Sequence, residues 1–255
     1  MTQVRISDMT RVEFDDRSAD TPILIPVGAL EQHGPHLPLD TDQAIAEAFA
    51  IELAEEVGAM VAPGIGYGCR SHPVSGGGEI FRATNSISGS TMSGIMFDIL
   101  RAFRGSGFRN FAFVNGHYEN AAFLVDTAHQ AVAVMPDLKV LVINWWEVAK
   151  LDYLQAIFDG NFPGWEAEHA GIVETSLMMH IAPDRVVEQL IEDRISDVRA
   201  PFYTVVPERS GLVDATGVLR TAWGSSARIG EGIFTHCRDE MVDVLRTEFP
   251  GEHQK

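Results

Sequence analysis

The segment Phe108–Val134, FRNFAFVNGHYENAAFLVDTAHQAVAV, indicates the fold class of this chain. It begins with an apolar run of strand length, Phe108–Asn115. After a short polar loop it continues with a helical pattern over Glu119–Val134, which ends before Pro136. A strand followed directly by a helix of this length is the repeating unit of sheets with parallel strands.

The same order of strand and helix occurs three more times around this segment. We expect strands at Thr21–Gly28, Met60–Pro63 and Lys139–Asn144, and helices at Thr41–Val57, Ser90–Arg104 and Trp146–Phe158, with a glycine-rich loop over Gly64–Gly89. The four units predict an α/β fold, a single domain over residues 1–255 with a mostly parallel sheet flanked by helices. Farther along we expect a helix at Gly171–Ile181, irregular structure over 193–224 and a closing helix at Arg228–Phe249.

The composition excludes several classes of partner. The chain has 255 residues, with 19 basic and 36 acidic side chains and therefore a net charge of −17. Such a surface repels nucleic-acid phosphates and anionic membranes. No run of about 18 apolar residues and no signal peptide is present. The two cysteines, Cys69 and Cys237, do not form a disulfide framework, so we expect a cytoplasmic protein with reduced thiols.

Histidines and carboxylates gather in two of the loops that follow the predicted strands. The first loop contains Glu31, His33, His36, Asp40 and Asp42, and the third contains the sequence NGHYEN at positions 115–120. Right-handed crossovers place these loops at one edge of the sheet, where ligands of such folds bind. Mixed nitrogen and oxygen donors of this kind suit Zn²⁺ or Mn²⁺.

Charge counting favours two metal ions over one. Glu31, Asp42 and Glu119 supply three negative charges, and two divalent ions with one hydroxide would neutralise them. Two ions about 3.5–4 Å apart can activate water and polarise a carbonyl together. His33 follows Glu31 by two positions, as Glu119 follows His117. Side chains at such spacing point the same way in an extended chain.

Each of these residues also has an ordinary structural interpretation. Asp42 alone fits the N-terminal cap of the helix that begins at Thr41, and His36 fits a structural role. A single tryptophan is more often part of the core than of a binding site. His169 stands at the foot of a helix and fits a cap equally well. Only the combination of residues on one sheet edge favours a metal centre.

Several motifs together resemble the creatininase (creatinine amidohydrolase) family. They are VGALEQHG at 27–34, Asp42, SGGG at 75–78, NGHYEN at 115–120, GW at 164–165 and HAGIVETSLM at 169–178. The likeness extends from about residue 5 to residue 250. The sequence NGHYEN is more similar to creatininase proper than to other branches of the family.

The resemblance implies roles for individual residues. Glu31 and His117 would bind one metal ion, His33 and Glu119 the other, and Asp42 would bridge both. His169, supported by Glu168, would transfer protons, and Glu119 would take part in catalysis as well as in metal binding. The substrate contacts would come from Ser75, Tyr118, Trp146, Trp165 and Glu166. The family also implies a homohexamer.

The sequence departs from the family pattern around the substrate pocket. His72-Pro73-Val74 replaces polar residues, and Glu79–Thr84 replaces a histidine and a Phe-Pro-Gly-Thr turn. Glu166 stands where an aspartate is expected. The five metal positions are intact, so these changes concern the substrate rather than the metals.

Three functions follow as hypotheses. The first is a dinuclear metal amidohydrolase that opens a small cyclic amide, with reversible conversion of creatinine to creatine as the leading reaction. The second keeps the metals but acts on another amide, as a formamide deformylase of a pyrimidine pathway or as a peptidase on a modified peptide. A deformylase for a phosphorylated substrate needs basic residues near the pocket, for which Arg70 and Arg82 are the candidates. The third is a metal-dependent scaffold without activity, which a complete ligand set and a candidate acid argue against.

Overall fold

A four-stranded parallel sheet forms the centre of the computed structural model, which describes residues 3–162, 164–165, 168–198 and 202–250. The strands are β1 (Ile23–Val27), β2 (Met60–Val61), β3 (Asn110–Asn115) and β4 (Lys139–Asn144). Their order in the sheet is β2-β1-β3-β4. All neighbouring pairs are parallel, and Ile23 pairs with both Met60 and Phe111. The predicted α/β class with a parallel sheet is therefore confirmed.

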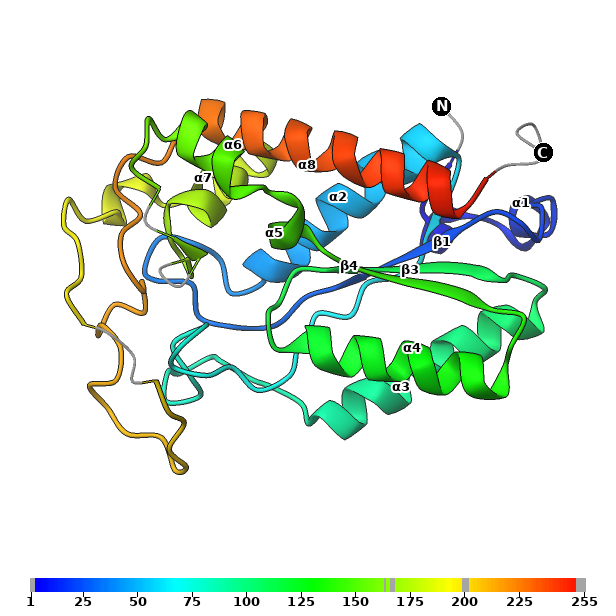
Figure 1. The fold of residues 1–255 in the computed structure, drawn as a ribbon, viewed down its shortest axis with the longest axis horizontal. Helices are drawn as coiled ribbons and strands as arrows, with labels where there is room; N and C mark the ends of the chain where they lie inside the picture. Colours follow the sequence, from blue (N-terminus) through cyan, green and yellow to red (C-terminus); the bar gives the residue numbers. More distant parts are fainter. Residues whose placement is uncertain (1–2, 163, 166–167, 199–201, 251–255) are drawn as a thin grey trace.

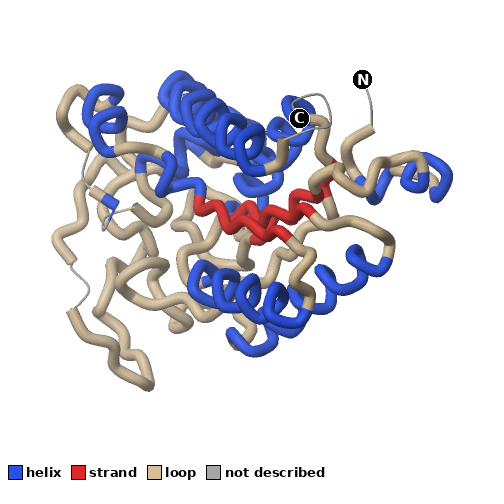
Figure 2. The backbone as a smooth tube through the Cα atoms, turned by 45° about the vertical axis from the view of Figure 1, so that its right-hand side comes forward, coloured by secondary structure: helices blue, strands red, loops and turns tan. Residues whose placement is uncertain are grey.

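Helices cover both faces of this sheet, as Figures 1 and 2 show. One face carries α2 (Thr41–Val57), α5 (Trp145–Val148), α6 (Leu151–Ile157), α7 (Ile172–Ile181) and α8 (Ala227–Glu248). The other carries α3 (Gly89–Gly105) and α4 (Asn120–Val134). Short elements complete the described fold: η1 (Ile6–Asp8), α1 (Arg11–Asp15), η3 (Pro183–Arg185) and η4 (Glu188–Leu190). No helix in this part of the chain combines the length and the hydropathy that a bilayer crossing requires.

Alternating side chains of the strands divide the core into two layers. Leu24, Ala112 and Val114 face the layer beneath α2, α7 and α8. Ile23 and Phe111 face the layer beneath α3 and α4. This alternation follows from the period of two in a β-strand, and both layers are apolar because helices cover both faces.

One predicted helix is interrupted. The sequence predicted a continuous helix over Trp146–Phe158, but the structure has α5 and α6 with extended backbone between them at Lys150 (φ −60°, ψ 141°). The first of the two helices begins one residue earlier than predicted, at Trp145, which is buried in the core at 2% exposure. The short helix α1 was not expected, although Thr10 and Glu13 form a reciprocal capping box that the sequence displays.

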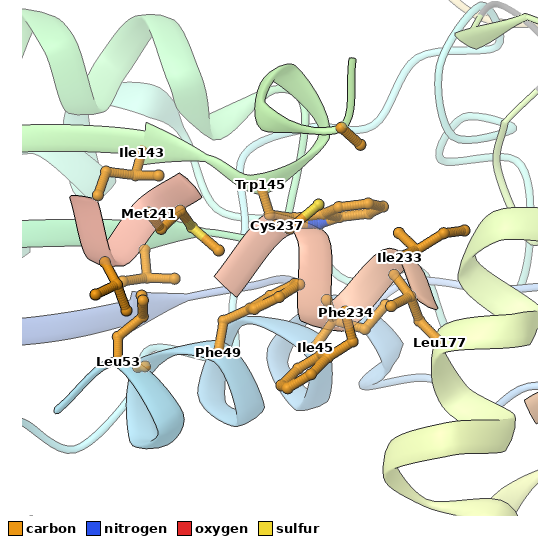
Figure 3. Close-up of a cluster of buried hydrophobic side chains, with 14 of the residues drawn as sticks. Ile45, Phe49, Leu53, Ile143, Trp145, Leu177, Ile233, Phe234, Cys237 and Met241 are labelled. Carbon is orange, nitrogen blue, oxygen red and sulfur yellow. The ribbon is translucent and has the colours of Figure 1, made fainter. Parts of the chain in front are cut away.

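Replacing Phe49 with alanine is expected to lower the free energy of unfolding by about 3–5 kcal/mol, because it leaves a cavity in a packed core. Phe49 of α2 is fully buried and stacks on Phe234 of α8, with ring centroids 4.4 Å apart (Figure 3). Denaturant unfolding measures the loss. The exposed Val134, replaced with alanine, is the control and should change stability by less than about 0.5 kcal/mol.

Candidate metal centre

A cavity of about 300 Å³ lies beyond the carboxyl ends of the strands. Segments that follow all four strands contribute to its wall, as the parallel topology predicts. Its lining consists of Glu31, Asp42, Val74, Ser75, Gly116, His117, Tyr118, Glu119, Trp145, Trp146, Trp165, Glu168, His169 and Glu174. The predicted convergence of loops from distant parts of the chain is confirmed.

Three buried side chains at the base of this cavity form a first donor group. Glu31, Asp42 and His117 present ligand atoms that all lie within 4.8 Å of one another. The Nδ1 atom of His117 is 3.1 Å from Oε2 of Glu31 and 2.9 Å from Oδ2 of Asp42. Asp42 is the second residue of α2, and its side chain contacts His117 instead of capping the helix.

A second donor group shares Asp42 with the first. His33, Asp42 and Glu174 also present ligand atoms within 4.8 Å of one another. The Nε2 atom of His33 is 2.9 Å from Oδ1 of Asp42 and 3.8 Å from Oε2 of Glu174. The two oxygens of Asp42 thus face the two histidines separately. This arrangement suits a carboxylate that bridges two ions.

Each histidine directs one ring nitrogen to a backbone carbonyl and the other to the carboxylates. The Nε2 atom of His117 lies 3.0 Å from the carbonyl of Cys69, and Nδ1 of His33 lies 3.2 Å from the carbonyl of Glu31. A carbonyl accepts a proton from the nitrogen that faces it, so the other nitrogen of each ring is the one that would give up its proton and bind a metal ion. Two buried atoms, Oε1 of Glu31 and Nε2 of His33, have no hydrogen-bond partner of acceptable geometry. The residues therefore fit a two-metal centre.

The electrostatics of the group favour bound positive charge. Burial lowers the pKa of a histidine, but the charge of Asp42 outweighs burial and raises the pKa of His33 to about 10. Burial also lowers the pKa of His117, but the charge of Glu31 outweighs burial. The pKa of His117 therefore lies well above its usual value. Burial likewise opposes ionisation of Asp42, yet the adjacent His33 holds the pKa of that carboxyl below its ordinary value. Divalent ions would displace these protons from the histidines and balance the charge of the carboxylates in their place.

Glu119 lies beside His117 and Ser75. The resemblance instead implied that it shares a metal ion with His33. Its Oε2 atom lies 3.3 Å from Nε2 of His117, and its Oε1 atom accepts a hydrogen bond from the hydroxyl of Ser75. The backbone N–H of His72 donates to the same Oε1 atom at 3.1 Å. The structure thus groups His33 with Glu174 rather than with Glu119, and metal binding by Glu119 remains a prediction.

His169 lies against His33 of the second donor group and is held by Gln32. Its ring centroid is 4.4 Å from that of His33, and its Nε2 atom is 2.8 Å from the carbonyl of Gln32. The side-chain amide of Gln32 also lies 2.9 Å from this nitrogen and donates to the carbonyl of Gly217 at 3.1 Å. Gln32 therefore joins the first loop to His169 and to the segment near residue 217.

Glu168 contacts α7 and shows no bond to His169 among the described residues. Its Oε1 atom accepts the backbone N–H of Val173 at 2.8 Å. Burial, together with the charge of Glu174, raises the pKa of Glu168 well above its usual value. The expected support of His169 by this carboxylate remains a prediction.

Aromatic side chains form one wall of the cavity. Tyr118 and Trp146 lie with ring centroids 6.0 Å apart. Trp145 stands edge-on to Trp146 at 6.2 Å and to Trp165 at 5.9 Å. Glu166, the remaining expected substrate contact, lies outside the described residues.

Three further residues bear on the hypotheses made from the sequence. His36 is buried and its Nε2 atom lies 2.8 Å from Oγ1 of Thr175, outside the donor groups, which agrees with a structural role. Burial and the charge of His33 lower the pKa of His36 to about 4. Arg70 lies 3.5 Å from Glu79, and neither it nor Arg82 belongs to the described lining of the cavity.

Sequence reasoning did not single out Glu174 or Gln32 as site residues. Glu174 lies in the first turn of α7, five positions after His169, and its Oε2 atom accepts the backbone N–H of Ala170 at 2.7 Å. The short separation in sequence between the Glu174 carboxylate and His169, a candidate catalytic residue, was the signal that could have identified Glu174. Gln32 stands between two predicted ligands, but its side-chain amide nitrogen contacts residues that are distant in sequence, among them Gly76 and Gly217.

Replacing Gly76 with alanine is expected to disturb the metal centre. The added Cβ would lie 2.1 Å from Oε1 of Glu31 and 2.5 Å from Oγ of Ser71. Overpacking of this kind costs about 1–3 kcal/mol, and displacement of Glu31 would also lower metal occupancy. Elemental analysis and denaturant unfolding measure both effects. Gly94 of α3, replaced with alanine, is the control, because no atom would lie within 4 Å of its Cβ. Full occupancy in the Gly76 variant would contradict the contact.

Known proteins share both the sequence and the fold. The creatininase family model, described as creatinine amidohydrolase, matches residues 7–245. The chain is 36% identical to the creatinine amidohydrolase of Pseudomonas putida, over 97% of this chain and 98% of that protein. It is 32% identical to the mycofactocin precursor peptide peptidase of Mycolicibacterium smegmatis, over 88% of this chain and 84% of that protein.

A solved structure of a manganese creatininase superposes with a TM-score of 0.94 at 36% identity and covers 98% of this chain and 100% of its own. The match of the family model to most of the sequence, the curated relative and the shared architecture agree with the motifs found around Glu31 and His117. The chain belongs to the creatininase (creatinine amidohydrolase) family.

Proposed function

We propose that this protein is a dinuclear metal amidohydrolase that opens creatinine to creatine, a reaction that can also run in reverse. The observation that carries the proposal is the pair of buried donor groups that share Asp42 at the base of an aromatic-walled cavity. The similarity to a creatinine amidohydrolase over nearly the whole chain supports the choice of substrate.

The residues that would hold the metals follow from the two donor groups. Glu31, Asp42 and His117 would hold one ion, and His33, Asp42 and Glu174 the other, with Glu119 available from the side of Ser75. Bound Zn²⁺ or Mn²⁺ supplies an activated water and a Lewis acid for the amide carbonyl. The similar manganese creatininase supports Mn²⁺ as one of these ions.

The side chains around the metals orient the substrate and move a proton. Trp146 and Trp165 offer faces on which a flat ring can stack, and Tyr118 and Ser75 add polar contacts at the same cavity. Hydrolysis adds a hydroxyl group to the ring carbonyl carbon and breaks the bond from that carbon to the ring nitrogen. His169, held by Gln32 at the cavity wall, is placed to give the leaving nitrogen its proton.

The lining of the cavity argues against a phosphorylated substrate. Among the described lining residues there is no lysine or arginine that could pair with a phosphate group. Creatinine carries no phosphate and needs no such partner. This observation removes the support that Arg70 and Arg82 would have given to a deformylase of phosphorylated compounds.

A panel of amides distinguishes creatinine from the other candidate substrates. The metal-loaded protein is expected to convert creatinine at least about tenfold more efficiently, as kcat/KM, than formamides or short peptides, a gap of about 1.4 kcal/mol in transition-state binding. Product creatine is measured by chromatography. Higher kcat/KM for a peptide would favour a peptidase, in agreement with the mycofactocin relative.

We also propose a cytoplasmic homo-oligomer, as a hexamer. Both cysteines are free and buried, which suits a reducing compartment. Phe202 and Tyr203 are 102% and 50% exposed with ring centroids 5.5 Å apart, and Val206, three positions farther along, is 84% exposed. Apolar residues gathered in this way suit contact with another copy of the chain. Light scattering should give six times the mass of one chain, and a monomer would contradict the proposal.

A further inference from the structure

We propose that Asn120 positions the metal ligand His117 through the backbone of Cys69. This inference rests on the metal centre proposed above and concerns the last residue of the sequence NGHYEN. Asn120 is fully buried at the start of α4 and contacts none of the metal ligands through its side chain in the described hydrogen bonds. An effect of this side chain on the metals must therefore pass through another residue, whereas the backbone N–H of Asn120 donates directly to the carbonyl of His117 at 3.2 Å and is kept in any side-chain variant.

Two hydrogen bonds connect the side chain of Asn120 to the imidazole ring of His117 through the backbone of Cys69. The Oδ1 atom of Asn120 accepts the backbone N–H of Cys69 at 2.8 Å. The backbone carbonyl of the same Cys69 lies 3.0 Å from Nε2 of His117 and accepts its proton. Cys69 is thus fixed on one side by Asn120 and fixes the imidazole on the other.

Asn120 itself is attached to the two central strands. Its Nδ2 atom donates to the carbonyl of Gly28, directly after β1, at 3.0 Å. The same amide nitrogen donates to Oδ1 of Asn115, the last residue of β3, at 3.3 Å. All the hydrogen-bonding capacity of the side-chain N–H groups is used, so the amide is held in one orientation. The position of Cys69 is therefore set by the rigid part of the fold.

The loop at Cys69 lies directly against the imidazole ring. A Cβ atom on Gly68 would stand 2.8 Å from Cδ2 of His117 and 3.0 Å from the carbonyl of Gly28. The carbonyl of Gly68 accepts the N–H of Ile87 at 2.8 Å, which ties the loop to the segment before α3. Only glycine allows this close approach of the loop to the ring.

The consequence is a fixed tautomer and a fixed direction for the metal-binding nitrogen. With the proton of Nε2 directed to the Cys69 carbonyl, Nδ1 of His117 faces Glu31 and Asp42 and is the nitrogen that would bind a metal ion in place of its proton. Oε2 of Glu119 lies 3.3 Å from the same Nε2 atom and is a second acceptor for that proton. Partners of this kind orient histidine ligands, and their removal typically lowers metal affinity about 10–100-fold.

The test compares metal affinity in paired variants, with chelator competition as the readout. In a His33→Ala background, which keeps the group of Glu31, Asp42 and His117, adding Asn120→Ala is expected to lower affinity for Mn²⁺ or Zn²⁺ about 10–100-fold. In a His117→Ala background, the same Asn120→Ala change is expected to leave affinity within about threefold. Equal effects in the two backgrounds, or none in either, would overturn the positioning role.

A further variant separates positioning from loss of the fold. Thr127→Val removes another fully buried polar group of α4, whose hydroxyl donates to the carbonyl of Phe123 within the same helix, and it should leave metal affinity unchanged. An equal loss of affinity in Thr127→Val and Asn120→Ala would contradict the proposal. A wild-type protein that binds neither metal would instead contradict the metal centre itself.

Discussion

Replacing Asp42 with asparagine is expected to remove both metal ions and to lower creatinine turnover at least about 10³-fold. Asp42 belongs to both donor groups, with Oδ1 2.9 Å from His33 and Oδ2 2.9 Å from His117. An amide offers one neutral oxygen where the carboxylate offers two charged ones. Loss of metal assistance worth several kcal/mol accounts for this factor, since each 1.36 kcal/mol is tenfold in rate.

Asp40 supplies the matched control, replaced with asparagine. It stands two positions before Asp42, is partly exposed and pairs with Arg185 at the surface. Its variant should keep two metals per chain and near-normal turnover, because surface ion pairs contribute little. Elemental analysis of both variants is decisive. An Asp42→Asn protein that retains both ions would show that the two groups do not share this carboxylate as a ligand.

Replacing His169 with alanine is expected to lower kcat about 10²–10⁴-fold while the metals stay bound. General acid catalysis contributes a factor of this size, and His169 is the buried imidazole at the cavity wall that Gln32 holds by its backbone carbonyl. Steady-state kinetics and metal content are measured together. His129, exposed on α4, is the control when replaced with alanine.

Metal content decides how this result is understood. His169 also presents a ligand atom within 4.8 Å of ligand atoms of Glu31 and His33. If the His169→Ala protein loses an ion, the histidine acts as a ligand rather than as a proton donor. Unchanged kcat with both ions bound would exclude it from either role.

Local patterns in the sequence were sufficient to predict the sheet and most of its helices. The helix predicted at Thr41–Val57 and the strand at Lys139–Asn144 have the same bounds in the structure. Glycine and proline mark the ends of such elements, and continuous apolar runs mark strands that are covered on both faces. The interruption of the helix predicted at Trp146–Phe158 was not predictable in this way, because the break falls at Ala149 and Lys150, where no glycine or proline marks it.

The site was predictable where its residues follow strands. Glu31, His117 and Asp42 come from the loop after β1, the loop after β3 and the first turn of α2, which the parallel topology brings to one edge. Which carboxylates lie beside which histidine depends on the directions of the side chains, and the spacing of residues in the sequence does not determine these directions. Glu174 takes its place beside His33 because α7 starts against the first loop, and the irregular segment before α7 carries no periodic signal.

Creatinine hydrolysis is best measured in the protein loaded with Mn²⁺ and Zn²⁺ beside a chelated sample. Creatine should form in the loaded sample, its formation should be lost in the chelated one, and it should recover when metal is restored. Two bound ions per chain should accompany the active state, as the two donor groups around Asp42 require. Creatine formation at the same rate with and without metal would contradict the account, and so would a loaded protein with two ions that leaves creatinine unchanged.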